Sequence, residues 1–244
     1  MSTFYIVATP IGNLEDISKR ALRIISEVDL ILCEDTRVTK KLLDHYEIKT
    51  PTLSYHQHSK LRKIEYILDL LQHNKNLALV SDAGTPGISD PGNKLIKRII
   101  ELLSNQVKIV PIPGPSAVTC AASISGFSMD KFIFMGFPPT KKKRKKFFEE
   151  IINSKYPVVL YESPYRIKKT LEQINETIKQ YNNIKTLRYR SGTLFPSEIT
   201  IQVVVCRELT KKFETIYRGT IEEILLQLSK EEIKGEFVIV LERK

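Results

Sequence analysis

The sequence predicts an α/β protein with two domains, and two observations lead to this prediction. In the first half of the chain, short apolar runs alternate with segments whose apolar residues recur at helical spacing. This alternation is typical of a parallel sheet that helices cover on both faces. The pattern changes after a helix of small residues at 116–124. We therefore place an N-terminal domain at 1–122 and a C-terminal domain with a mixed sheet at 123–244.

The elements of the N-terminal domain follow from these patterns in order. The chain opens with a short apolar run at 4–8, which ends at Pro10 and is predicted to form a buried strand. Further apolar runs predict strands at 29–33, 77–80 and 107–110. Between them, apolar residues spaced by three or four positions predict helices at 17–28, 61–71 and 95–103.

The C-terminal domain follows a linker around Gly126 and begins with a strand at 132–135. One apolar face predicts a helix at 167–178. Apolar runs then predict strands around 203–205 and 237–240. Between these two strands, Thr220 and Glu223 form a capping-box pair that opens another helix.

Composition places the protein in a broad class. The hydrophobic fraction is 42% and the charged fraction 27%, as in ordinary globular proteins. No apolar run approaches the roughly 20 residues that cross a bilayer, and the N-terminus has no secretory pattern. Three widely spaced cysteines, Cys33, Cys120 and Cys206, indicate a reducing compartment. We expect a cytoplasmic protein without a membrane segment.

The net charge of +10 is concentrated in one run of six cations. We predict that this run lies in a loop at 139–146, which Pro138 and Pro139 stiffen at its base, and that it binds nucleic acid phosphates. The alternative is a solvated loop without a partner. The six candidate RNA-binding residues are Lys141, Lys142, Lys143, Arg144, Lys145 and Lys146.

Three loops rich in Gly, Pro, Ser and Asp follow predicted strands, at 8–13, 81–92 and 111–117. Ligands of open α/β sheets bind at the carboxyl ends of strands, and we expect these loops to form a rigid binding cleft. Gly114 would leave room for the ligand, and Ser116 would lie at a helix N-terminus that attracts anions. Each loop could instead be only a tight turn. The candidate residues are Pro10, Gly12, Asp82, Ala83, Gly84, Thr85, Ser89, Gly114, Pro115, Ser116 and Ala117.

Other familiar sites are missing from the sequence. It contains neither a dinucleotide fingerprint nor a Walker A motif. His56 and His58 are the closest approach to a metal-binding pair, and a polar loop explains them better than a metal does. We expect no metal.

Several motifs together resemble the ribosomal RNA small-subunit methyltransferase I family of tetrapyrrole-methylase-like enzymes. They are CEDTR at 33–37, SDAGTPGISDPG at 81–92, IPGPSA at 112–117, YESP at 161–164 and RELTK at 207–211. The resemblance implies a homodimer of two-domain subunits, with a cofactor cleft between the two domains. It also implies S-adenosylmethionine as cofactor and 2′-O-methylation of a cytidine in the decoding region of 16S rRNA. The chain departs from the family at Tyr165, where histidine is usual, and in a longer stretch at 181–201.

The resemblance and the chemistry of methyl transfer suggest further site residues. Asp35, Asp82 and Glu162 are the candidate catalytic carboxylates, because a 2′-hydroxyl needs a proton acceptor. Tyr161 is a candidate cofactor contact. Arg37 and Arg166 are candidates for binding RNA phosphate. Each also has a structural alternative: the aspartates could cap helices or turns, and Arg166 could pair with Glu162.

Two other functions remain open. The same fold could methylate a carbon atom of a tetrapyrrole, although the basic run argues for a polyanionic substrate. A non-catalytic ribosome-binding protein is the other alternative, and the three intact loops argue against it. Cofactor binding would separate this last alternative from the two enzymes.

Overall fold

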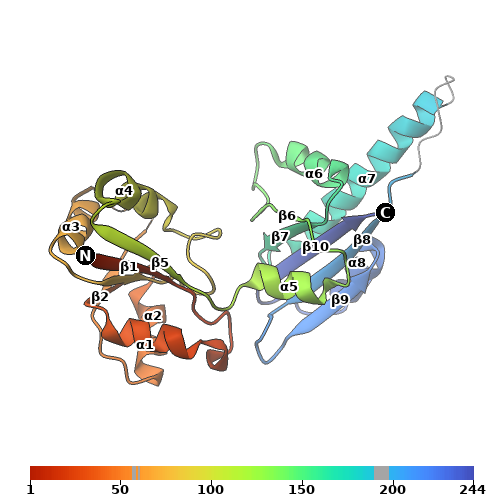
Figure 1. Cartoon of the computed structure of the whole chain (residues 1–244). Coiled ribbons are helices and arrows are strands. Elements are labelled where there is room, and N and C mark those ends of the chain that lie inside the picture. Colours follow the sequence, from red (N-terminus) through yellow and green to blue (C-terminus); the bar gives the residue numbers. More distant parts are fainter. Residues whose placement is uncertain (57–58, 60, 190–197) are drawn as a thin grey trace. The chain divides into compact units, whose positions relative to one another are not determined.

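The computed structural model describes residues 1–56, 59, 61–189 and 198–244 (Figure 1). It divides the chain into two compact units, Met1–Ser116 and Ala117–Lys244. His58 and part of the stretch 181–201 lie outside the described residues. Within the described ranges, no helix is long and apolar enough to cross a bilayer.

The first unit is built on a sheet of five parallel strands in the order β3-β2-β4-β1-β5. In chain order the strands are β1 (Ser2–Val7), β2 (Leu30–Cys33), β3 (Thr52–Ser54), β4 (Leu77–Leu79) and β5 (Val107–Ile112). The helices are α1 (Lys19–Glu27), α2 (Thr36–His45), α3 (Leu61–Gln72) and α4 (Asn93–Leu103), with a short 3-10 turn η1 (Leu14–Asp16). The predicted parallel sheet is confirmed.

Helices cover both faces of this sheet, because successive strand residues point to opposite sides. Ile31 and Cys33 pack in one apolar cluster with residues of α1 and α2. Leu32, between them, packs in a second cluster with residues of α3 and α4. In a strand that is buried on both faces, no side chain points to solvent. This explains why its sequence is a continuous apolar run.

The second unit contains a mixed sheet in the order β6-β7-β10-β8-β9, as predicted. β6 runs parallel to β7 and the other neighbours are antiparallel. The strands are β6 (Ile133–Phe134), β7 (Val158–Glu162), β8 (Ile201–Arg207), β9 (Thr215–Gly219) and β10 (Phe237–Arg243). The helices are α5 (Ala117–Ser125), α6 (Arg144–Asn153), α7 (Ile167–Tyr189) and α8 (Ile221–Ser229). The predicted capping box of Thr220 and Glu223 opens α8.

Two features of the second unit differ from the sequence expectation. Helix α5, most of which falls within the predicted first domain at 1–122, packs on β10 and β7. Arg218 of β9 fixes its end by donating to the carbonyl oxygens of Ile124 at 2.6 Å and Ser125 at 3.0 Å. The expected loop at 139–146 is also shorter, because α6 begins at Arg144.

Candidate functional site

The three Gly- and Pro-rich loops follow β1, β4 and β5, which are neighbours in the first sheet. Because parallel strands end at the same edge, the loops meet there. The Thr9 amide donates to the Gly84 carbonyl oxygen at 2.9 Å, and the Gly84 amide donates back at 3.0 Å. The Thr85 hydroxyl donates to the Pro115 carbonyl oxygen at 3.2 Å. The structure therefore brings the predicted loops of this unit together in a hydrogen-bonded group.

Two glycines make this close approach of the loops possible. Gly84 has φ +82°, which side chains rarely adopt, and an added Cβ would lie 3.3 Å from Ile11. At Gly114, an added Cβ would lie only 3.0 Å from the Cβ of Ala8. We expected the missing side chain of Gly114 to leave room for a ligand. In the structure, Ala8 packs against Gly114 at this position. A larger residue there would disturb the end of β1.

Other candidate residues of the first unit have distinct positions. Pro10 and Gly12 lie in the loop after β1, and Ala83, Asp82 and Ser89 lie in the loop after β4, where all three are exposed. Ser116 directly precedes α5, which begins at Ala117 as the sequence analysis expected. Among the residues that the structure describes, no group of three His, Cys, Asp or Glu side chains could hold a metal ion.

Asp35 and Arg37 are paired with each other. Asp35 caps α2 by accepting from the Arg37 amide at 2.8 Å, and its carboxylate forms an ion pair with the Arg37 guanidinium at 2.6 Å. The hydrogen bonds from the Arg37 side chain lower the pKa of Asp35 to about 2. Such a carboxylate is a weak proton acceptor. The structural alternative for Asp35, that it caps a helix, is confirmed.

A further carboxylate at this edge escaped the sequence analysis. Glu34 directly follows β2 and is partly buried. Burial raises the pKa of its carboxyl, and the negative charge of Asp82 raises it further. Asp82 itself accepts from the Asp35 amide at 3.0 Å, so it links the loops after β2 and β4. The only sequence signal for Glu34 was its place inside CEDTR.

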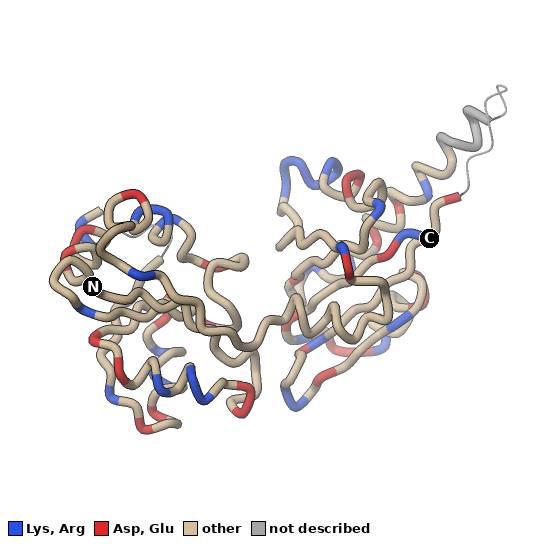
Figure 2. The backbone as a smooth tube through the Cα atoms, in the orientation of Figure 1, with Lys and Arg blue, Asp and Glu red and all other residues tan. Residues whose placement is uncertain are grey.

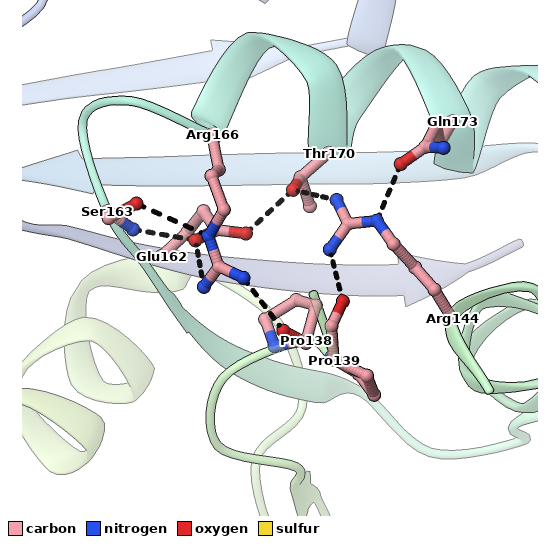
Figure 3. Close-up of polar contacts among 8 residues, drawn as sticks. All are labelled: Pro138, Pro139, Arg144, Glu162, Ser163, Arg166, Thr170 and Gln173. Carbon is pink, nitrogen blue, oxygen red and sulfur yellow. Dashed lines mark hydrogen bonds and ion pairs between the residues drawn. The ribbon is translucent and has the colours of Figure 1, made fainter. Parts of the chain in front are cut away.

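In the second unit, Glu162 is the centre of a buried polar network (Figure 3). Its side chain has no exposed area and forms an ion pair with Arg166 at 2.8 Å. It also accepts from the Ser163 amide and from the Thr170 hydroxyl, each at 2.7 Å. The structural alternative for Arg166, a pair with Glu162, is thus confirmed.

Arg144 completes this network from the start of α6. It donates to the Thr170 hydroxyl at 2.6 Å, to Gln173 at 2.6 Å and to the Pro139 carbonyl oxygen at 2.8 Å (Figure 3). Its residue surface is only 8% exposed, and its guanidinium lies 4.8 Å from the centre of the Phe148 ring. Arg144, which the sequence analysis proposed as an RNA contact, is thus buried, and each of its three guanidinium nitrogens donates to a partner inside the protein.

The other five cations of the run are exposed, and Figure 2 shows them as blue segments at the start of α6. Lys143 adopts a left-handed conformation with φ 66° and is the N-cap residue that precedes the helix. We call these five residues the basic turn: Lys141, Lys142, Lys143, Lys145 and Lys146.

Tyr161 lies on β7 in the second unit, one residue before Glu162. Its ring contacts Phe134 and Phe137, with ring centres 4.9 Å and 5.4 Å apart. Tyr165, in contrast, is 95% exposed in the turn that leads into α7.

A family model described as Tetrapyrrole (Corrin/Porphyrin) Methylases matches residues 3–225. The chain is 41% identical over 241 residues to Ribosomal RNA small subunit methyltransferase I of Halalkalibacterium halodurans, covering 98% of this chain and 75% of that protein. It is 40% identical to the Thermotoga maritima protein of the same name, covering all of both chains.

The fold also resembles a solved structure. The X-ray structure of cobalt precorrin-4 methyltransferase, a cobalamin biosynthetic enzyme, matches with a TM-score of 0.63. The match covers 98% of this chain and 94% of that one, at 18% sequence identity. At this identity the likeness supports the fold alone.

Replacing Arg166 should expose how much the second unit depends on the network. Arg166→Met leaves the buried Glu162 carboxylate without its counter-charge, which should lower the free energy of unfolding by about 3 kcal/mol. Urea denaturation measures this change. Lys179→Met is the control, because Lys179 pairs with Glu222 on the surface, and it should cost at most about 0.5 kcal/mol. Equal effects of both variants would contradict the role of the network.

Proposed function

The chain belongs to the tetrapyrrole (corrin/porphyrin) methylase family, within the group named ribosomal RNA small subunit methyltransferase I, and from this membership we propose that it methylates ribosomal RNA. Its methyl donor is S-adenosylmethionine, the cofactor of this family. We further propose that the methyl group goes to the 2′-oxygen of a cytidine in the decoding region of 16S rRNA. The observation that carries the proposal is the hydrogen-bonded group of three loops beside the carboxylates of Glu34 and Asp82.

The residues at the carboxyl edge of the first sheet fit this cofactor chemically. The cofactor carries a sulfonium and an ammonium group, and the carboxylates of Glu34 and Asp82 provide negative charge at this edge. Ser116, which ends the loop after β5, is the candidate donor to the carboxylate of the cofactor. Gly84 and Gly114 keep the loop backbones close. Tyr161 belongs to the second unit and is a candidate contact on sequence grounds alone.

The cofactor supplies an activated methyl group on sulfur, so the protein must mainly position the ribose oxygen and remove a proton. A carboxylate at this edge would accept the proton that the 2′-oxygen loses when it takes up the methyl group. Asp35 is a weak acceptor, since Arg37 holds its pKa at about 2. We propose Glu34 as the proton acceptor, because its raised pKa suits the task. Asp82 orders the loop beside it.

The basic turn favours RNA over a tetrapyrrole as the substrate. Five exposed lysines at the start of one helix suit a polyanion, whereas a tetrapyrrole needs only a few cations. Incubation with labelled S-adenosylmethionine and either small ribosomal subunits or a tetrapyrrole precursor tests the proposal. Label in the tetrapyrrole alone would support the carbon-methylating alternative. Absence of label from both, with cofactor bound, would support a non-catalytic ribosome-binding protein.

We also propose that the protein acts as a homodimer, as its family resemblance implies. A light-scattering mass near the 28.1 kDa of one chain at micromolar concentration would contradict this.

The cofactor site can be tested at Ala83, which is exposed. Ala83→Leu adds bulk on the outside of the loop, where a cofactor would lie, without entering the core. We expect the affinity for S-adenosylmethionine to fall by about tenfold or more, measured by calorimetry, with an unchanged melting temperature. Asn105→Leu, before β5 at the opposite edge of the sheet, is the control and should bind normally. Normal binding by Ala83→Leu would refute this site.

The basic turn can be tested by replacing its five lysines with glutamine while keeping Arg144. The slope of log affinity for RNA against log salt should flatten by up to about 0.9 for each duplex phosphate that the variant no longer neutralises, or about 0.7 on single strands. Filter binding at several salt concentrations measures the slope. The control has the same net charge and replaces five exposed lysines of the first unit: Lys40, Lys41, Lys94, Lys97 and Lys108. Identical slopes for the two variants would mean that the basic turn makes no special interaction with RNA.

A further inference from the structure

Two exposed aromatic side chains lie on segments that contact the same buried network as the start of α6. Phe137 is 52% exposed and Tyr165 is 95% exposed. Large aromatic rings are usually buried, and an exposed one suits a binding surface. A single exposed ring is ordinary. The informative feature is that these two lie on loops that the same buried network holds.

The network fixes the two loops against each other (Figure 3). The Arg166 guanidinium donates to the Pro138 carbonyl oxygen at 3.1 Å. Phe137 directly precedes Pro138, and Tyr165 directly precedes Arg166, so this one hydrogen bond joins the neighbours of both aromatic residues. Contact with the Tyr161 ring supports Phe137 from within the unit. Two exposed rings are therefore carried by loops whose backbones cannot easily separate.

The surroundings of these rings are cationic. Arg144 donates to the Pro139 carbonyl oxygen at 2.8 Å, which ties the start of α6 to the loop that carries Phe137. The exposed lysines of the basic turn lie on either side of Arg144 in the sequence. Aromatic rings that accompany a row of lysines match the chemistry of unpaired RNA, in which bases stack on rings and phosphates bind cations.

We propose that Phe137 and Tyr165 form a stacking platform for unpaired bases of an RNA whose phosphates bind the basic turn. This rests on the proposed function, since it takes RNA as the substrate, and it narrows the substrate to a single-stranded or unstacked segment. In a duplex, the bases are stacked on each other and present only their edges and phosphates to such a surface. The platform therefore discriminates between unpaired and paired RNA.

The affinity test compares an unstructured RNA of about 12 nucleotides with a duplex of the same length. Phe137→Leu and Tyr165→Leu keep apolar volume but remove the stacking face. Each should weaken binding of the single strand by about tenfold and leave duplex binding and the salt slope unchanged. Tyr165→His, which restores a ring, should recover most of the loss. Fluorescence anisotropy with labelled RNA measures all of these affinities.

The chain offers a matched control in Phe213. Its side chain is 68% exposed, and the Lys212 ammonium lies 5.6 Å from the centre of its ring, so it is also an exposed ring beside a cation. Phe213 is in the turn between β8 and β9, at the opposite edge of the sheet from β6. Phe213→Leu should leave single-strand binding unchanged. If it weakens binding as much as Phe137→Leu does, the effect is one of general surface hydrophobicity, and the platform is refuted.

A second readout does not depend on loss of binding. The chain contains no tryptophan, so Tyr165→Trp introduces a single indole fluorophore. Stacking on a base should quench its emission on addition of the single strand, and the duplex should quench it much less. Phe213→Trp should respond to neither. Equal emission with and without saturating single strand would overturn the proposal even if the affinity were normal.

These outcomes separate the platform from the proposed function itself. If wild-type protein binds RNA with the salt slope of the basic turn but the leucine variants bind single strands normally, only the platform is refuted. The proposal that this surface binds RNA is also refuted in two cases. In the first, the wild-type chain binds neither the single strand nor the duplex. In the second, the salt slope is the same with and without the five lysines. Circular dichroism of each variant confirms that the fold is intact.

Discussion

The second unit depends on one fully buried carboxylate, that of Glu162. A buried charge without partners would be very costly, so the protein must surround it with donors. Arg166, Thr170 and the Ser163 amide are these donors. The Thr170 hydroxyl in turn accepts a hydrogen bond from Arg144. These partners come from the end of β7, from α7 and from α6. Satisfying one charge therefore fixes the relative position of three elements of this unit.

The first unit depends on backbone geometry rather than on charge. Parallel strands send three loops to one edge, and the reciprocal hydrogen bonds of Thr9 and Gly84 join two of them. The loops can pack this closely because glycine has no side chain. At Gly114, an added Cβ would lie only 3.0 Å from the Cβ of Ala8. Different interactions therefore stabilise the candidate surfaces of the two units. Tight backbone packing does so in the first unit, and a buried ion pair does so in the second.

Most of the architecture could be predicted from the sequence, because buried strands and amphipathic helices leave periodic apolar patterns. β3 was missed because two of its three residues, Thr52 and Ser54, are polar, and α2 because its three buried residues interrupt a mainly polar segment. The loops of the candidate site were predictable from composition. The role of Arg144 was not, because among lysines it looks like one more cation. Its partners Thr170 and Gln173 lie far along the chain, and only folding brings them together.

The two arginines of the network hold the loop at 138–139 through its carbonyl oxygens and not through its side chains. Every amino acid has a carbonyl oxygen, so this anchoring does not depend on which residues occupy the loop. The outward-facing side chains nearby could therefore diverge during evolution while the backbone stays in place. With such a scaffold, the backbone conformation of the loop can be conserved while the surface side chains that determine specificity change. One fold can then acquire new substrates through substitutions at its surface.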